Sequence, residues 1–148
     1  MAPPADLQTV PELLRTSPGF LLGKAAQRGA ELVERALAPL NLKARHYGVL
    51  AALDELGPRA QHQLGQLLRI DRTTMVAVVD HLERLGFAER TTDPQDRRAA
   101  QVRITRAGQV ALDLARGTVH AADAALVSRL SSAQREHLVV LLEKLVES

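Results

Sequence analysis

The stretch that decides the fold is residues 60–105, AQHQLGQLLRIDRTTMVAVVDHLERLGFAERTTDPQDRRAAQVRIT. Leucines recur at helical spacing over residues 60–69, and a second set of apolar residues recurs at that spacing from Met75 to Leu85. Asp71 is a candidate N-cap for the second helix, and Gly86 is a candidate stop at its end. Two short helices joined by a tight turn predict a helix-turn-helix.

After Gly86 the apolar period changes from helical to two, which predicts strands over residues 87–92 and 99–105. The cluster Asp93-Pro94-Gln95-Asp96 between them is typical of a turn, so Arg97 and Arg98 would lie at the tip of a β-hairpin, or wing. We expect the carboxylate of Asp96 to hold the Arg98 guanidinium in one orientation for insertion into a narrow minor groove. A solvated turn with a weak surface ion pair would give the same local pattern.

The flanking sequence predicts four more helices. A helix over 18–40 begins at Ser17-Pro18, and a helix over 43–56 ends at Gly57-Pro58. A long helix over 106–129 follows the candidate cap Thr105, and a last helix over 131–147 begins with a capping box of Ser131 and Gln134. We expect this last helix to bury four leucines: Leu138, Leu141, Leu142 and Leu145.

The predicted fold class is therefore mostly α, a winged helix-turn-helix with a two-stranded wing and with N- and C-terminal helices for dimerisation. Residues 1–17 are proline-rich and are expected to form a flexible arm. Residues 18–148 are expected to form one domain, with a DNA-binding lobe over about 43–105 and dimerisation helices over about 18–40 and 106–147. The two C-terminal helices carry more apolar surface than one small core can hide, which predicts a two-fold homodimer.

Composition limits the functional classes. The chain has 148 residues, a net charge of +2, 2% aromatic residues and no Cys or Trp. Few aromatics argue against a base-stacking module for single strands, and the absence of Cys excludes disulfides, thiolate metal sites and thiol redox switches. Neither a membrane span nor a secretion signal is evident, so a soluble cytoplasmic protein without a membrane partner is expected.

The sequence offers little for a metal site or for catalysis. His120 and Asp123 are three residues apart on one predicted helix, but a zinc site needs three or four converging ligands. We find no phosphate-binding glycine loop, no nucleophile motif and no spaced carboxylate pair. The protein is therefore expected to be no enzyme and to use no metal or other cofactor.

The predicted second helix of the pair places polar residues opposite its apolar stripe. In a helix-turn-helix this face enters the major groove of double-stranded DNA. The candidate contacts on it are Arg72, Thr73, Thr74, Ala77 and Arg84, and those of the wing are Asp96, Arg97, Arg98 and Arg103. An ordinary solvated helix face remains the alternative for this segment alone.

Together these segments resemble the MarR family of winged helix-turn-helix transcriptional regulators. The wing motif is Asp96-x-Arg98, followed by Ile104-Thr105 and Gly108, within DPQDRRAAQVRITRAG; RIDRTTMVAVVDHLERLGFAER is similar to the family's recognition helix, and LKARHYGVLAAL to the helix before it. The resemblance implies that Arg98 enters the minor groove, that Asp96 braces it, and that Thr73 and Thr74 meet the major groove. It also implies that the first and last two helices form the dimer. Ala77 departs from an Arg or polar residue in several relatives, which leaves the bases read at this position open.

The family resemblance also suggests how the protein is switched. A chain without Cys and without convincing metal spacing is most simply controlled by a small organic ligand. In the family, aromatic acids bind where the second helix, here with Arg45, His46 and Tyr47, meets the dimer helices; Tyr47 could instead be a core residue. We therefore predict a dimeric repressor of a pseudo-palindromic operator, relieved by a phenolic or carboxylic acid, with a winged-helix protein-interaction module that binds no operator as the alternative.

Overall fold

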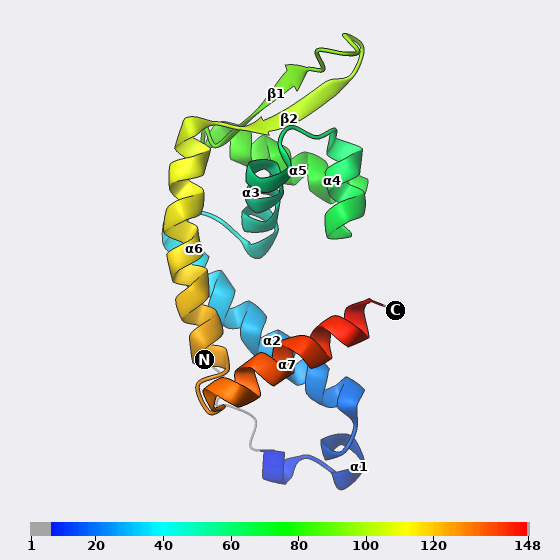
Figure 1. Ribbon diagram of the computed structural model, residues 1–148, viewed down its shortest axis with the longest axis vertical. Helices are drawn as coiled ribbons and strands as arrows, with labels where there is room; N and C mark the ends of the chain where they lie inside the picture. Colours follow the sequence, from blue (N-terminus) through cyan, green and yellow to red (C-terminus); the bar gives the residue numbers. More distant parts are fainter. Residues whose placement is uncertain (1–6, 148) are drawn as a thin grey trace. The chain divides into compact units, whose positions relative to one another are not determined.

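The computed structural model describes residues 7–147, and it consists of helices and one β-hairpin (Figure 1). In chain order the elements are the 3-10 helix η1 (Leu7–Thr9), α1 (Glu12–Arg15), α2 (Pro18–Leu37), the 3-10 helix η2 (Ala38–Leu40), α3 (Ala44–Leu56), α4 (Gln61–Leu68), α5 (Arg72–Arg84), β1 (Ala88–Thr92), β2 (Ala100–Ile104), α6 (Arg106–Leu126) and α7 (Ser132–Val146). The order confirms the predicted fold class, a winged helix-turn-helix flanked by helices.

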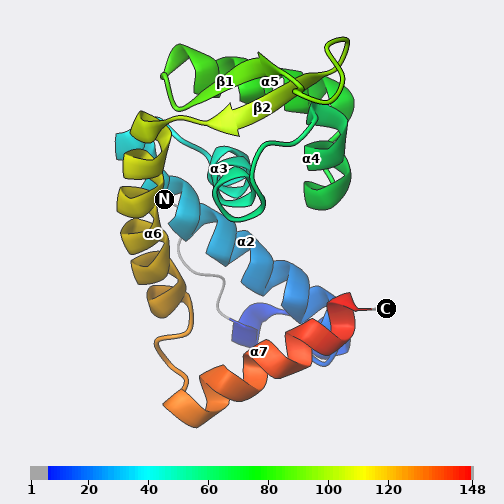
Figure 2. The same cartoon turned by 45° about the horizontal axis from the view of Figure 1, so that its top comes forward.

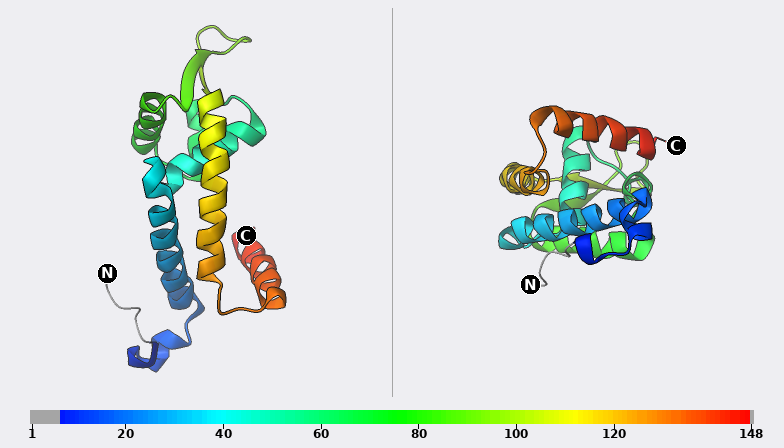
Figure 3. Two further views of the ribbon diagram at one scale, coloured as in Figure 1. Left: turned by 90° about the vertical axis from the view of Figure 1, so that its left-hand side faces the viewer. Right: turned by 90° about the horizontal axis from the view of Figure 1, so that it is seen from below.

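The chain forms two compact units, one over residues 33–120 and one that joins the residues before 33 to those after 120. Both α2 and α6 continue from one unit into the other without interruption (Figure 3). The first unit extends beyond residues 43–105, because Leu37 and Leu112 are fully buried in its core.

In the 33–120 unit, α3, α4 and α5 all contact the hairpin; they lie below it in Figure 1, and Figure 2 shows the hairpin in front of α5. The strands β1 and β2 pair antiparallel from Ala88 opposite Ile104 to Thr92 opposite Ala100. The backbone of Arg59 forms an isolated antiparallel bridge with Val102 of β2, through two hydrogen bonds. Beneath the hairpin the core contains five large side chains from three helices: Leu50, Leu53, Leu64, Met75 and Leu82.

The turn between α4 and α5 is fixed by backbone geometry and a cap. Arg69 ends α4 in the left-handed region at a φ of 52°, and the Ile70 N–H donates to the Gly65 carbonyl over 2.9 Å. The Asp71 carboxylate accepts the Thr74 N–H over 2.9 Å, which confirms Asp71 as the N-cap of α5. The α5 helix therefore begins where the sequence predicts it.

The junction of the wing with α6 depends on Thr105 and Gly108. The Thr105 hydroxyl donates to the Gly86 carbonyl over 2.6 Å and accepts the Gly108 N–H over 3.1 Å. A Cβ on Gly108 would lie 2.0 Å from the carbonyl oxygen of Phe87, so only glycine allows this approach. The motif residues Thr105 and Gly108 thus tie the base of the wing to the first turn of α6.

The other unit contains α1, most of α2, the end of α6 and α7. Ser131 and Gln134 form the predicted capping box at the start of α7. Two expectations about these helices were wrong. The long helix ends at Leu126 and not near residue 129, because a turn follows in which the Leu130 N–H donates to Val127. No residue of α7 is buried within this chain: of the four leucines expected to be buried, Leu138 is half-buried, and Leu141, Leu142 and Leu145 are 45%, 37% and 60% exposed.

The N-terminal segment predicted to be a flexible arm contains two short helical turns, η1 and α1. The sequence does not predict them because proline is typical of helix breaks, whereas here Pro11 directly precedes α1 and lies outside the helix. Residues 1–6 of that arm lie outside the described residues. Over the described range, 7–147, no helix combines the length and apolar character needed to cross a membrane.

Candidate nucleic-acid interface

The exposed face of α5 carries most of the predicted major-groove contacts. Arg72, Thr73, Ala77 and Arg84 are all exposed, while Met75, Val78, Val79 and Leu82 are buried on the opposite side. Val76 is also 38% exposed on this helix, although the sequence analysis did not include it among the contacts. Its apolar character made it a poor candidate in the sequence, yet an exposed Val can contact a thymine methyl group.

Thr74 differs from the other predicted contacts on α5. Its hydroxyl donates to the Asp71 carboxylate over 2.6 Å, in addition to the backbone contact of the cap. The hydrogen bonds from Thr74 hold the pKa of Asp71 below its usual value. The hydroxyl proton of Thr74 is therefore committed to the cap, and only its oxygen lone pairs are open to another partner.

At the tip of the wing, Asp96 and Arg98 interact in a different way from the one expected. The Asp96 carboxylate accepts the backbone N–H of Arg98 over 3.0 Å and does not contact its guanidinium. The short i to i+2 spacing favours this side-chain-to-backbone bond over an ion pair. Asp96 thus braces the turn, and within residues 7–147 the guanidinium groups of Arg97 and Arg98 form no ion pair.

Arg103 lies on β2 and is exposed, but its charge is compensated. Its guanidinium forms an ion pair with Glu89 on the neighbouring strand, its direct partner in the register. The sequence could not identify this pair before the register was known. The uncompensated positive charge of the wing is therefore concentrated at Arg97 and Arg98.

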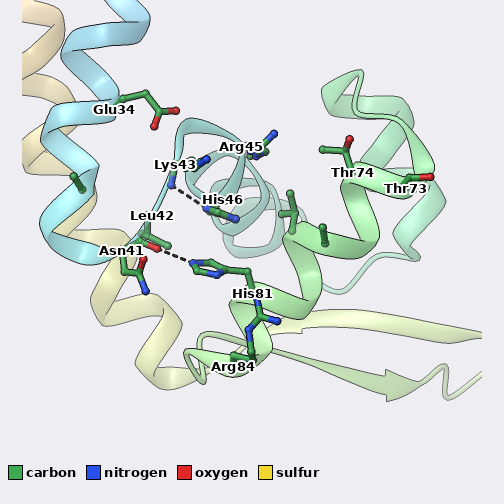
Figure 4. A pocket seen from close by; sticks show the side chains of 13 residues that line it. Glu34, Asn41, Leu42, Lys43, Arg45, His46, Thr73, Thr74, His81 and Arg84 are labelled. Atoms are coloured by element: carbon green, nitrogen blue, oxygen red, sulfur yellow. Dashed lines mark hydrogen bonds between the residues drawn. The ribbon is translucent and has the colours of Figure 1, made fainter.

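A pocket of about 610 Å³ adjoins the same face of α5 (Figure 4). It lies within the 33–120 unit, and its lining includes Arg45 and His46 of α3 together with Thr73, Thr74, Ala77 and Arg84 of α5. Two sets of residues that the sequence analysis treated separately, the effector contacts and the DNA contacts, thus share one pocket. Tyr47 does not line it and packs at the edge of the hydrophobic core.

His46 is buried beside this pocket, and its contacts define its protonation. Its Nδ1 accepts the Lys43 backbone N–H over 2.9 Å, and its ring stacks on that of His81 with centroids 4.4 Å apart. Burial lowers the pKa of His46, and electrostatic interactions with His81, Arg45 and Lys43 lower it further, to about 4. His46 is therefore neutral near pH 7, with its proton on Nε2.

His81 connects α5 to the segment that follows α2. Its Nε2 lies 2.7 Å from the Asn41 carbonyl oxygen, so the Nε2–H donates to that oxygen. Asn41 itself has a left-handed backbone at a φ of 57°, where it ends η2. Sequence reasoning missed this contact because the two residues are forty positions apart.

Among the residues that the structure describes, no three His, Asp or Glu side chains come together in a group that could hold a metal ion.

A helix-turn-helix followed by a hairpin with two arginines at its tip defines a winged helix-turn-helix protein. A family model described as MarR family matches residues 40–99. The transcriptional repressor NicR of Pseudomonas putida is 26% identical over 144 residues, which cover 97% of this chain and 91% of NicR.

Solved structures also match this chain over most of its length. A probable transcriptional regulator from Pseudomonas aeruginosa has a TM-score of 0.81 at 32% identity, covering 89% of this chain and 98% of the other. The repressor CouR, solved with a 23-mer DNA duplex, has a TM-score of 0.85 at 29% identity, covering 91% of this chain and 96% of CouR. The chain belongs to the MarR family of transcriptional regulators.

Proposed function

We propose that this protein is a cytoplasmic, dimeric transcriptional repressor that binds double-stranded operator DNA and is released by a small organic acid. In this proposal α5 enters the major groove and the wing tip enters the adjacent minor groove. The surfaces for dimerisation lie in the helices over 18–40 and 106–147.

The observation that carries the proposal is the exposure of uncompensated positive charge at the tip of the wing. Arg97 and Arg98 are exposed beyond a turn that Asp96 fixes, and Arg72 is exposed at the start of α5. Guanidinium groups in such positions match phosphates and base edges, whereas a wing that docks on protein has no need of them. CouR, bound to a DNA duplex, supports the same use of this fold.

Operator binding can be tested by fluorescence anisotropy with the DNA upstream of the protein's own gene. We expect Arg98→Ala to weaken operator binding by about 1–3 kcal/mol and to lower the salt slope by about one unit. Arg15→Ala on α1 removes the same charge outside the 33–120 unit and should leave the affinity unchanged. Equal affinities of wild type and Arg98→Ala would contradict the proposal, and specific capture of a protein without DNA binding would favour the protein-interaction alternative.

We further propose that the pocket of Figure 4, which α3 and α5 line, holds the ligand that releases the operator. Its volume lies within the range of about 300–1,000 Å³ that small-molecule sites occupy. Lys43, Arg45 and Arg84 line it, and Glu34 is its one carboxylate, so the lining favours an anionic ligand. CouR has been solved with p-coumaroyl-CoA, and BpsR of Bordetella bronchiseptica is regulated in DNA binding by 6-hydroxynicotinic acid.

The ligand can be sought by thermal-shift screening of phenolic, aromatic and heteroaromatic carboxylic acids. An acid that raises the melting temperature should release the operator from the wild type, and Arg45→Ala should need a higher concentration of it. Arg15→Ala is again the control. Release by peroxide alone, or control of binding by sub-micromolar Zn²⁺, would contradict a small-ligand mechanism.

A further inference from the structure

One charged residue of the wing faces the helices and not the solvent. Arg90 lies on β1 opposite Val102, and both residues are on the face of the hairpin that covers the core. Side chains alternate between the two faces of a strand, so this position would ordinarily hold an apolar residue. The neighbouring outward position, Glu89, instead pairs with Arg103 within the hairpin. A guanidinium on this face needs acceptors on the helices that the hairpin covers, because burying an unpaired charge is costly.

Arg90 finds those partners on two helices. Its guanidinium forms ion pairs with Glu83 and, over 2.9 Å, with Asp80, which lie on successive turns of α5. Its Nη2 also donates to the Gln61 side chain at the start of α4 over 3.1 Å. The second oxygen of Glu83 accepts the backbone N–H of Arg90 over 2.8 Å. Glu83 thus holds both the backbone and the side chain of Arg90. One residue thus joins β1, α4 and α5.

The ion pairs of Arg90 are less exposed to solvent than an ordinary surface ion pair and therefore hold the wing more firmly. The side chain of Arg90 is only 31% exposed, and that of Glu83 only 34%. The planar guanidinium contacts several acceptors at once, which restricts rotation of the wing about α5 more than a single point charge would. The third partner, Asp80, is more exposed, at 48%, and its carboxylate contacts the wing through Arg90.

Two of the elements that Arg90 joins, the wing strand β1 and the recognition helix α5, belong to the parts that the proposed function places in adjacent grooves of DNA. If the angle between them varied, one contact would have to be made before the other, and ordering the second would cost affinity. A fixed angle presents both contacts together, and affinity then comes from both at once. On an unrelated DNA sequence only one of the two contacts, that of α5 or that of the wing, is made. The fixed angle therefore adds little to the affinity for such a sequence.

We propose that Arg90 is a positioning residue that locks the recognition helix and the wing into one rigid unit, so that both grooves of the operator are engaged together. This inference rests on the proposed operator binding. Arg90 contacts the DNA only through the elements that it holds. Its removal therefore lowers the preference for operator over unrelated DNA more than it lowers the affinity for unrelated DNA.

The first test compares affinities for the operator and for a scrambled duplex at one salt concentration, at a temperature where every variant is folded. We expect Arg90→Gln to reduce the operator-to-scrambled ratio at least about tenfold and Arg90→Lys, which can reach fewer acceptors, to reduce it less. Asp54→Asn is the matched control, because it breaks another ion pair between two elements of the same unit, Asp54 with Arg116. It should lower stability without changing the ratio.

The second test needs no DNA. The chain contains no Cys, so Ala77→Cys on α5 and Gln95→Cys in the wing introduce the only thiols for a pair of spin labels. Dipolar distance measurements on labelled full-length protein, diluted with unlabelled protein, should show a narrow distribution that Arg90→Gln broadens and Asp54→Asn does not.

The two tests separate the proposals. An unchanged distance distribution, or an unchanged affinity ratio in Arg90→Gln, would overturn the positioning role. If the wild type fails to distinguish the operator from scrambled DNA, the proposed function fails and with it the role in DNA binding. In that case the distance measurement still decides whether Arg90 locks the wing.

Discussion

Gly108 shows how a single residue fixes the geometry of the wing. A Cβ at this position would meet the Phe87 carbonyl oxygen at 2.0 Å and the Ile104 side chain at 2.8 Å. The first obstacle is backbone and cannot rotate away. The approach of α6 to the base of the hairpin therefore requires glycine here.

We predict that Gly108→Ala lowers the free energy of unfolding by about 2–4 kcal/mol, because the hairpin must separate from α6 to admit the methyl group. Gly117→Ala on the same helix is the control, since a Cβ there meets nothing within 4 Å. It should stabilise the protein by about 0.5–1 kcal/mol through helix propensity. Urea unfolding measures both, and equal effects of the two substitutions would show that the contact with Phe87 is unimportant.

His46 makes the stability depend on pH. Its pKa is lowered to about 4 from 6.5, so the unfolded chain takes up the proton first as the pH falls. The contribution of neutral His46 to the free energy of unfolding is complete above about pH 6.5, and it is lost as the pH falls from 6.5 to 4. The full shift corresponds to at most about 3 kcal/mol, and solvent access from the pocket reduces this to about 1–2 kcal/mol.

The matched variant for this pH effect is His46→Gln. A glutamine can accept the Lys43 N–H as Gln63 accepts the Ala60 N–H over 3.0 Å, but it does not titrate. Between pH 7 and pH 5 the wild type should lose about 1–2 kcal/mol more stability than His46→Gln, as measured by urea unfolding. Parallel pH profiles of the two proteins would exclude His46 as the source.

At the level of elements, the turn of the helix-turn-helix contains a strained residue. Arg69 adopts a left-handed backbone at a φ of 52°, which suits glycine better than a residue with a Cβ. We predict that Arg69→Gly raises the free energy of unfolding by about 0.5–1 kcal/mol. Arg69→Ala removes the same charge and keeps the Cβ, so it should bring no gain; thermal unfolding of the two variants decides between relief of strain and loss of charge.

Sequence patterns predicted the elements well where the signal is local. The cap at Asp71, the capping box of Ser131 and Gln134, and the hairpin after Gly86 all depend on residues within a few positions of one another. The end of α6 at Leu126 was harder, because no Gly or Pro within residues 126–130 marks it.

Sequence reasoning missed two kinds of contact. In one the partners are distant in the chain, and in the other a polar side chain bonds to a neighbouring group of a cap or a turn. Arg90 contacts Gln61, twenty-nine residues away, and the pairing of Arg103 with Glu89 depends on the strand register. Thr74 and Asp96 lie in the helix and the turn that the sequence predicts. Their hydrogen bonds, however, go to a cap and to a turn, since neighbouring backbone groups are the nearest partners.

For the whole molecule, the apolar surface of α7 is the strongest sign of a partner. Leu141, Leu142 and Leu145 are exposed, and so are Val139, Val140 and Val146 on the same helix. An exposed apolar patch of this kind indicates an interface, and the proposed homodimer would cover it.

We predict that the double substitution Leu141→Glu and Leu145→Glu gives a monomer by light scattering and removes specific operator binding, because two half-sites can no longer be engaged together. Leu67→Glu is the control, since Leu67 is 54% exposed on α4 and belongs to neither helical region proposed for the dimer. A dimeric double variant would show that the interface lies elsewhere.

The place of Tyr47 has a spectroscopic consequence. It is the single Tyr of a chain without Trp, and it packs against the core of the 33–120 unit. Its fluorescence therefore reports on that unit alone, while far-ultraviolet circular dichroism reports on every helix. Following both signals through one denaturation would show, without any added label, whether the winged-helix unit and the remaining helices unfold in one transition or in two.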